Sequence, residues 1–147
     1  DQLAGLITRK LTCLRRLCEL GCQQMEMVHA GSMTQLLDLL AVKQRFLLEL
    51  QRIERDLDPF RSQDPETRRW RTQADRARCA EELAECETLL AKIVEQEKTS
   101  EAALVKRREE TAVKLHAAHD AGAARGAYSS AGHAADRPGQ LDLTSER

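Results

Sequence analysis

Few residues of this chain have types and spacing that could do chemistry, and a histidine motif is the first of them. Glu26-Met-Val-His29 matches one half of the Glu-x-x-His pattern that holds paired metal ions in helical bundles. That site needs a second copy of the pattern, but His116 and His119 have no acid three residues before them. We therefore predict a surface or boundary histidine at position 29 and no metal site.

The five cysteines are the second candidate for chemistry. They are Cys13, Cys18, Cys22, Cys79 and Cys86. Structural zinc sites usually draw ligands from Cys-x2-Cys pairs, which this chain lacks. Disulfide scaffolds are shorter, rich in loops and usually carry an even number of cysteines. We predict free thiols in a reducing cytoplasm, with Cys18, Cys79 and Cys86 packed in a core as small hydrophobes.

One basic cluster stands out, Arg68-Arg-Trp-Arg71 followed by Arg76 and Arg78. If the chain folds back near residue 60, the cluster lies beside acids at the end of the preceding helix. These acids are Glu54, Asp56 and Asp58. Charge pairing across the fold is our preferred interpretation, and RNA binding is the rival one. A single aromatic residue offers RNA no stacking platform, so we expect Trp70 to pack on Phe60.

The sequence gives no evidence of catalysis, of nucleic-acid binding or of membrane insertion. It shows no serine nucleophile motif, phosphate-binding loop or paired acids in an apolar setting, so we predict no enzyme, no catalytic residue and no cofactor. The net charge is −1, from 23 basic and 24 acidic residues. Such neutrality gives no bulk attraction to nucleic acid or anionic lipid. No apolar run approaches the roughly 18 residues of a membrane span, and no signal layout begins the chain.

The elements that must position any functional residue are predicted to be helices. Of the 147 residues, 32% are charged and 3% aromatic, which is typical of long helices packed by a narrow apolar seam. The first seam advances by alternating four- and three-residue steps. It consists of Ala4, Ile7, Leu11, Leu14, Cys18, Gly21, Met25 and Val28. Leu3, Leu6 and Leu17 widen it, which predicts a bundle, and Gly21 would allow a neighbour to approach closely.

A break is predicted at Gly31, which can cap one helix while Ser32-Met-Thr-Gln35 opens the next as a capping box. One continuous helix is the alternative. The second helix is expected to end at Asp58-Pro59, since the residue before a proline resists helical geometry. Its expected seam is Leu36, Leu37, Leu40, Leu47, Leu50, Ile53 and Leu57.

The third helix is predicted to start at Asp64-Pro65-Glu66 and to run to about Ala121. Its expected seam is Cys79, Leu83, Cys86, Leu90 and Ile93, resuming at Leu104, Ala112 and Leu115. The polar stretch Glu97–Ser100 is where we expect the helix to bend or leave its partner. The predicted fold is all-α, an elongated antiparallel helical hairpin or bundle of about three long helices. The bundle domain covers residues 1–121 with a hinge near 58–65, and residues 122–147 form a flexible glycine/alanine-rich tail.

Three features together resemble the FlgN-type flagellar export chaperone family. One is a leucine-rich helix with a Lys-Gln step after a short turn. It reads Ala30-Gly31-Ser32, Leu36-Leu37-Asp38-Leu39-Leu40, Lys43-Gln44 and Leu47-Leu48-Glu49-Leu50. The second is the order of a helix, a leucine-rich helix and a long charged helix. The third is Tyr128-Ser-Ser-Ala-Gly132, which is similar to the family's Tyr-x-x-x-Gly element.

The resemblance implies a cytoplasmic bacterial protein, monomer or homodimer, that keeps hook–filament junction subunits unassembled. It would deliver these hook-associated flagellar proteins to the export gate. By position, cargo binding would fall on Leu104, Val105 and Leu115, and docking at the export gate on Tyr128. The competing hypotheses are a coiled-coil structural or scaffolding adaptor with no export role, and a helical metal-dependent enzyme.

Overall fold

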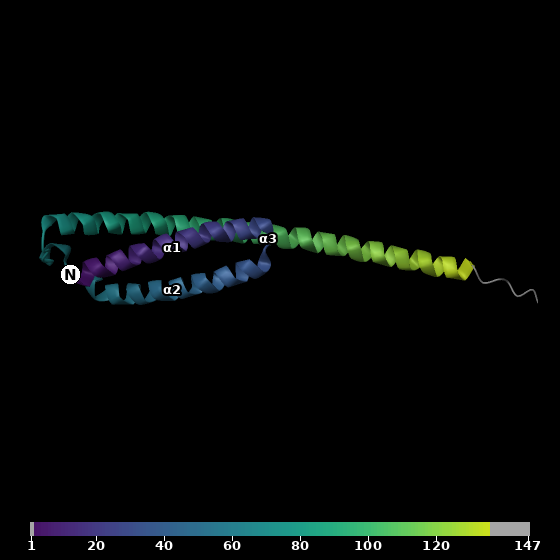
Figure 1. Ribbon diagram of the computed structural model, residues 1–147, viewed down its shortest axis with the longest axis horizontal. Coiled ribbons are helices and arrows are strands. Elements are labelled where there is room, and N and C mark those ends of the chain that lie inside the picture. Colours follow the sequence, from purple (N-terminus) through teal and green to yellow (C-terminus); the bar gives the residue numbers. More distant parts are fainter. Residues whose placement is uncertain (1, 136–147) are drawn as a thin grey trace, which may run out of the picture. The chain divides into compact units, whose positions relative to one another are not determined.

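The computed structural model describes residues 2–135, which form three α-helices and one short 3-10 helix (Figure 1). The helices are α1 (Gln2–Ala30), α2 (Met33–Arg61) and α3 (Gln73–Ala135), with η1 (Pro65–Thr67) between the last two. Residues 2–135 contain no strand, so the all-α prediction with three long helices is confirmed. The described residues divide into two units, 2–105 and 106–135. We call residues 2–105 the body and residues 106–135 the C-terminal segment.

In the body, α1 lies between α2 and the first part of α3 (Figure 1). Its contact with α2 uses a seam of alternating three- and four-residue steps, and all the residues of this seam are buried. They are Leu3, Leu6, Lys10, Cys13, Leu17, Leu20 and Gln24. Lys10 Nζ lies 2.6 Å from Glu54 Oε1, whereas Gln24 Oε1 accepts a hydrogen bond from Lys43 Nζ. The pairing runs in opposite directions, so α1 and α2 are antiparallel.

A second seam of α1 contacts α3. Its residues are displaced by one sequence position from those of the first seam. Six of the predicted members are buried, and they are Ile7, Leu11, Leu14, Cys18, Gly21 and Val28, whereas Ala4 and Met25 are half-buried. Thr8 Oγ1 donates to Glu82 Oε2 at 2.8 Å, and Gln96 Nε2 donates to the Cys18 carbonyl at 3.2 Å. The two helices are therefore parallel. A Cβ at Gly21 would overlap the Gln96 amide, which confirms the close approach predicted there.

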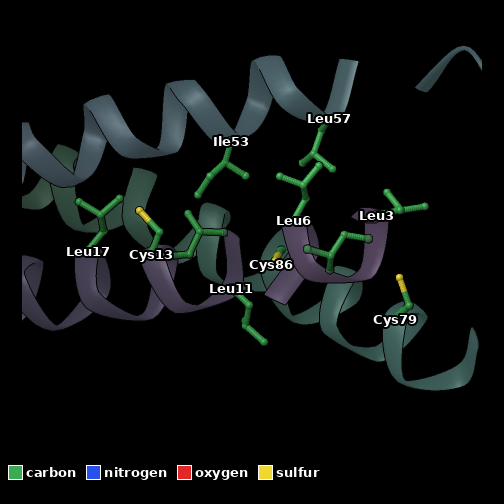
Figure 2. Packing of buried hydrophobic residues seen from close by; sticks show 11 residues of the cluster. Leu3, Leu6, Leu11, Cys13, Leu17, Ile53, Leu57, Cys79 and Cys86 are labelled. Carbon is green, nitrogen blue, oxygen red and sulfur yellow. The ribbon is translucent and has the colours of Figure 1, made fainter. Parts of the chain in front are cut away.

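The seam of α2 differs from the expected one. Ile53 and Leu57 point from α2 toward α1 (Figure 2), as predicted. Leu37, Leu40 and Leu47, however, are exposed. The residues that face inward keep strict three- and four-residue steps: Leu36, Leu39, Lys43, Phe46, Leu50, Ile53 and Leu57. The prediction was wrong because it followed the leucines and skipped Lys43, which the spacing requires.

A polar layer crosses the body where Lys43 enters this seam. Lys43 is only 5% exposed, and its ammonium donates to Gln24 Oε1 of α1 at 2.7 Å and to Glu97 of α3. Ser100, one turn after Glu97, is buried. α3 therefore still contacts the body through Glu97 and Ser100 instead of leaving its partner there, which corrects our expectation. Polar residues in an apolar seam specify register at a cost in stability.

The turn between α1 and α2 confirms the break at Gly31, whose φ is 72°. Ser32 N–H donates to the Met27 carbonyl at 3.1 Å and Gly31 N–H to the Val28 carbonyl at 3.3 Å. This pair of bonds satisfies the last carbonyls of α1, and glycine adopts the left-handed conformation without strain. The predicted capping box does not form, since the Ser32 side chain makes no capping hydrogen bond.

The connection from α2 to α3 is longer than predicted. α2 passes through Pro59 and ends at Arg61, although a proline inside a helix removes one backbone hydrogen bond. Phe60, the next residue, packs on the core. The Asp64 carboxylate does accept a hydrogen bond from the Glu66 N–H at 3.0 Å, as a helix cap would. The element that begins there, however, is only the short helix η1. α3 starts at Gln73, where Thr72 Oγ1 accepts from Asp75 N–H at 3.0 Å. Thr72-Gln-Ala-Asp75 was the helix-start signal that we missed.

The end of α3 was predicted too early. The helix continues from Ala121 to Ala135, so part of the expected tail is helical. Residues 122–135 contain six alanines, the best helix formers, whereas each of the three glycines costs only about 1 kcal/mol. The rest of the expected tail, residues 136–147, lies outside the described residues.

We predict that Glu97→Ala lowers the free energy of unfolding by about 1–2 kcal/mol, because it leaves the buried ammonium of Lys43 with less compensation. Urea denaturation measures this loss. Glu101→Ala, one turn further along on an exposed position, should stay within about 0.5 kcal/mol of the wild type. Lys43→Met in the Glu97→Ala background should recover stability. Equal losses for the two glutamate variants would contradict the polar layer.

We also predict that the fold loses stability as the pH rises above 9. Burial raises the pKa of the Cys13, Cys18, Cys79 and Cys86 thiols above the ordinary value of 9.0. The unfolded chain then releases protons that the folded chain keeps, which favours unfolding. Burial also lowers the pKa of Lys43 from 10.5, and this has the opposite effect on stability. It is the effect of one group, however, against that of four thiols. Urea denaturation at pH 8, 9 and 10 measures the slope.

A variant without one of the buried thiols checks the origin of this slope. Cys86→Ala should make the fall with pH shallower. A stability that stays level between pH 8 and 10 in the wild type would show that the thiols do not titrate on unfolding as burial requires.

Candidate partner-binding surfaces

The C-terminal segment exposes every side chain described in it, from Lys106 to Gly132. Two of the predicted partner-binding residues lie here, Leu115 at 66% exposure and Tyr128 at 82%. Val113 is exposed as well, although no prediction included it. Small residues at steps of three and four, Ala112, Ala118 and Gly122, share a face with Leu115. A partner helix could therefore come close to the backbone around Leu115.

Leu115 and Tyr128 do not form one surface. They are 13 residues apart in a regular α-helix, which places them about 140° apart around its axis. Val113 lies about 160° from Leu115 by the same geometry. One partner helix cannot cover Leu115 and Tyr128 together, so the segment offers two separate contacts.

Leu104 and Val105, the other predicted residues, are the last two positions of the body. Leu104 is half-buried, and Val105 is exposed. The structure thus assigns the four predicted residues to two units, with two residues in each.

An exposed apolar surface that the sequence reasoning missed lies on α2. We call it the α2 outer face, and it consists of Met33, Leu37, Leu40, Leu47 and Leu48. Contiguous exposed apolar patches usually mark interaction sites. The doublets Leu36-Leu37 and Leu39-Leu40 could have predicted this exposed face. Neighbouring residues of a helix lie about 100° apart around its axis, so a narrow seam buries only one leucine of each doublet.

The chemistry candidates occupy ordinary positions. His29 is exposed as predicted, and one of its ring nitrogens, Nδ1, lies 2.9 Å from the Met25 carbonyl oxygen. The five cysteines are free thiols, and the predicted burial of Cys18, Cys79 and Cys86 is confirmed. Within residues 2–135, no group of three or more His, Cys, Asp or Glu side chains could hold a metal ion.

The predicted pairing of the basic cluster with the end of α2 was wrong. Glu54 is paired with Lys10 and Arg61, and Asp58 is paired with Arg61. The competing cations come from α1 and from α2 itself. Arg68 instead donates to the Phe60 carbonyl. The expected neighbours Trp70 and Phe60 do line one pocket, which is described below.

We predict that Leu36→Gln lowers the free energy of unfolding by about 3 kcal/mol, because it puts an amide into a packed core. Leu37→Gln should change this quantity by less than about 0.5 kcal/mol, because Leu37 is 67% exposed and Leu36 only 4%. Urea denaturation of the two neighbours compares them directly. A larger loss at Leu37 would mean that α2 presents the opposite face to the core.

None of the helices in the described range is long and apolar enough to cross a bilayer. No protein-family model, curated protein or solved structure matches the chain. The surfaces above must therefore be interpreted from their own geometry.

Proposed function

We propose that this chain is a cytoplasmic export chaperone of the FlgN type. It binds hook–filament junction subunits and delivers them to the flagellar type III export apparatus. The observation that carries the proposal is the C-terminal segment, a helix whose described side chains are all exposed and which has Leu115 and Tyr128 on different faces. A chaperone that hands its cargo to a second receptor needs two such contacts.

The residues that carry the family resemblance occupy structurally distinct places, which supports the proposal. Ala30-Gly31-Ser32 forms the tight turn between α1 and α2. The leucine-rich stretch after it supplies the inner seam of α2 and the α2 outer face. Lys43, of the Lys-Gln step, is the centre of the polar layer. The short motifs that carry the resemblance thus correspond to defined structural features of the body.

Cargo capture on the C-terminal segment follows from its composition. A cargo helix laid along Ala112, Leu115 and Ala118 would bury one large apolar side chain among small ones. Full burial of a leucine contributes about 1.5–3 kcal/mol, before the cost of ordering the partner. Binding on this face is therefore modest and reversible, as transport of a subunit requires.

The second contact is Tyr128. This residue is 82% exposed, so it can bury apolar area and form a hydrogen bond in the same contact. Because it points away from the Leu115 face, a receptor can bind Tyr128 while the cargo is still held. We assign Tyr128 to the export gate.

We expect Leu115→Asp to weaken binding of a purified hook–filament junction subunit at least tenfold in isothermal titration calorimetry, because a charge is then placed in the contact. Val113→Asp, on the opposite side of the same helix, is the matched control and should bind within about twofold of the wild type. Tyr128→Ala should keep cargo affinity but lose capture by the cytoplasmic domain of the export gate. Equal losses at Leu115 and Val113, or none at either, would refute the cargo face.

A coiled-coil scaffolding adaptor is the second candidate, and the α2 outer face is the observation that favours it. An adaptor would use this face to form a stable homo-oligomer without cargo. Light scattering after gel filtration, with and without the junction subunit, separates the two proposals. An oligomer that persists with the subunit present and loses its mass in Leu37→Glu would support the adaptor.

A further inference from the structure

A pocket at the α2–α3 connection has chemistry that the chaperone proposal does not use. We call it the hinge pocket; its volume is about 460 Å³, and it belongs to the body. Its apolar side consists of Leu3, Phe60 and Trp70. Leu3 belongs to the core cluster, and both aromatic rings pack against that cluster. Its polar side includes Arg68 and Arg69. The pocket thus combines a fixed apolar wall with two guanidinium groups.

Arg68 is incompletely paired in this position. Its Nη2 donates to the Phe60 carbonyl at 2.6 Å, which holds the guanidinium over the end of α2. Its Nε is buried and has no hydrogen-bond partner. A buried donor without an acceptor destabilises the folded chain, and buried polar groups are rarely left in that state. A small rotation toward the pocket opening would expose this N–H to an acceptor.

The acids near the pocket are engaged elsewhere. Asp64 caps the Glu66 N–H, and Glu66 lies 3.6 Å from Arg76 in a loose ion pair. Arg61 is held by Glu54 and Asp58. Among residues 2–135, neither Arg68 nor Arg69 is in an ion pair. The pocket therefore carries uncompensated positive charge beside apolar surface.

We propose that the hinge pocket binds an acidic segment of another protein through an apolar side chain and a neighbouring carboxylate. The apolar side chain lies against Leu3, Phe60 and Trp70. The carboxylate accepts hydrogen bonds from Arg68, which turns to pair its Nε, and from Arg69. Arginine and carboxylate form short, charge-assisted bonds in a fixed fork. This contact goes beyond the proposed function, because it involves neither Leu115 nor Tyr128.

A protein segment fits the pocket better than a nucleic acid does. Single-stranded nucleic acids are held by a basic groove with aromatic rings on which successive bases stack. Here the only tryptophan is half-buried against the core cluster, and the basic groups face one concave site. A side chain of leucine size with an adjacent aspartate matches both parts of this site.

The single tryptophan of the chain makes the test direct, because it lines this pocket. The probe is the pentapeptide acetyl-Ala-Leu-Asp-Leu-Ala-amide, titrated into the full chain at low salt. We expect a saturable change in emission, and at least tenfold weaker binding when asparagine replaces the aspartate. Raising the salt to 0.5 M should weaken binding of the acidic peptide only.

Two variants assign the contact to its residues. Arg68→Gln should lose at least tenfold in affinity for the acidic peptide. Arg71→Gln, a neighbour that does not line the pocket, should bind within about twofold of the wild type, and circular dichroism should show both variants folded. Equal binding of the two peptides, unchanged binding by Arg68→Gln, or no binding in fluorescence and calorimetry would each overturn the proposal. Tighter binding of a hexathymidylate than of the peptide would overturn it in favour of nucleic acid.

Discussion

The body depends on one constraint, the burial of two adjacent seams of α1 at the same time. One seam contacts α2 and the other contacts α3, and each keeps its own alternation of three- and four-residue steps. A helix with two buried, mostly apolar seams is stable only when each seam is covered, so it must lie between two partners. The directions of α2 and α3 follow from the contacts that these seams make. The polar layer around Lys43 then joins all three helices at one level of the body.

Much of this could be predicted from the sequence, and the failures have physical causes. The Gly31 break and the α1 seam were accessible because glycine geometry and apolar periodicity are local signals. The α2 seam was not, because the prediction used residue type where spacing decides, and so passed over Lys43. The start of α3 was misplaced because Pro65 sets a local angle that serves a 3-10 turn as well as an α-helix. The pairing of Glu54 with Lys10 depends on the packing of α1 against α2, which no local pattern reveals.

The candidate surfaces show the same division between local and tertiary information. Tyr128 and Leu115 were predicted from the sequence as single residues, but their separation around the helix follows only from an α-helix that runs unbroken past Ala121. The α2 outer face can be identified once the inner seam is known. The inner seam buries one leucine of each doublet, so the other leucine is exposed. The hinge pocket could not be found at all, because Leu3 and Trp70 come together only when α1 packs beside the α2–α3 connection.

The tight turn at Gly31 also affects how the chain assembles. Only two residues separate α1 from α2, whereas eleven separate α2 from α3. Closing a short loop loses little chain entropy and brings sequence neighbours together early. The α1–α2 pair can therefore form while α3 is still emerging from the ribosome, as N-terminal parts commonly do. The nascent pair would present the bare Cys18–Gly21 side of α1 to the cell until α3 arrives to cover it.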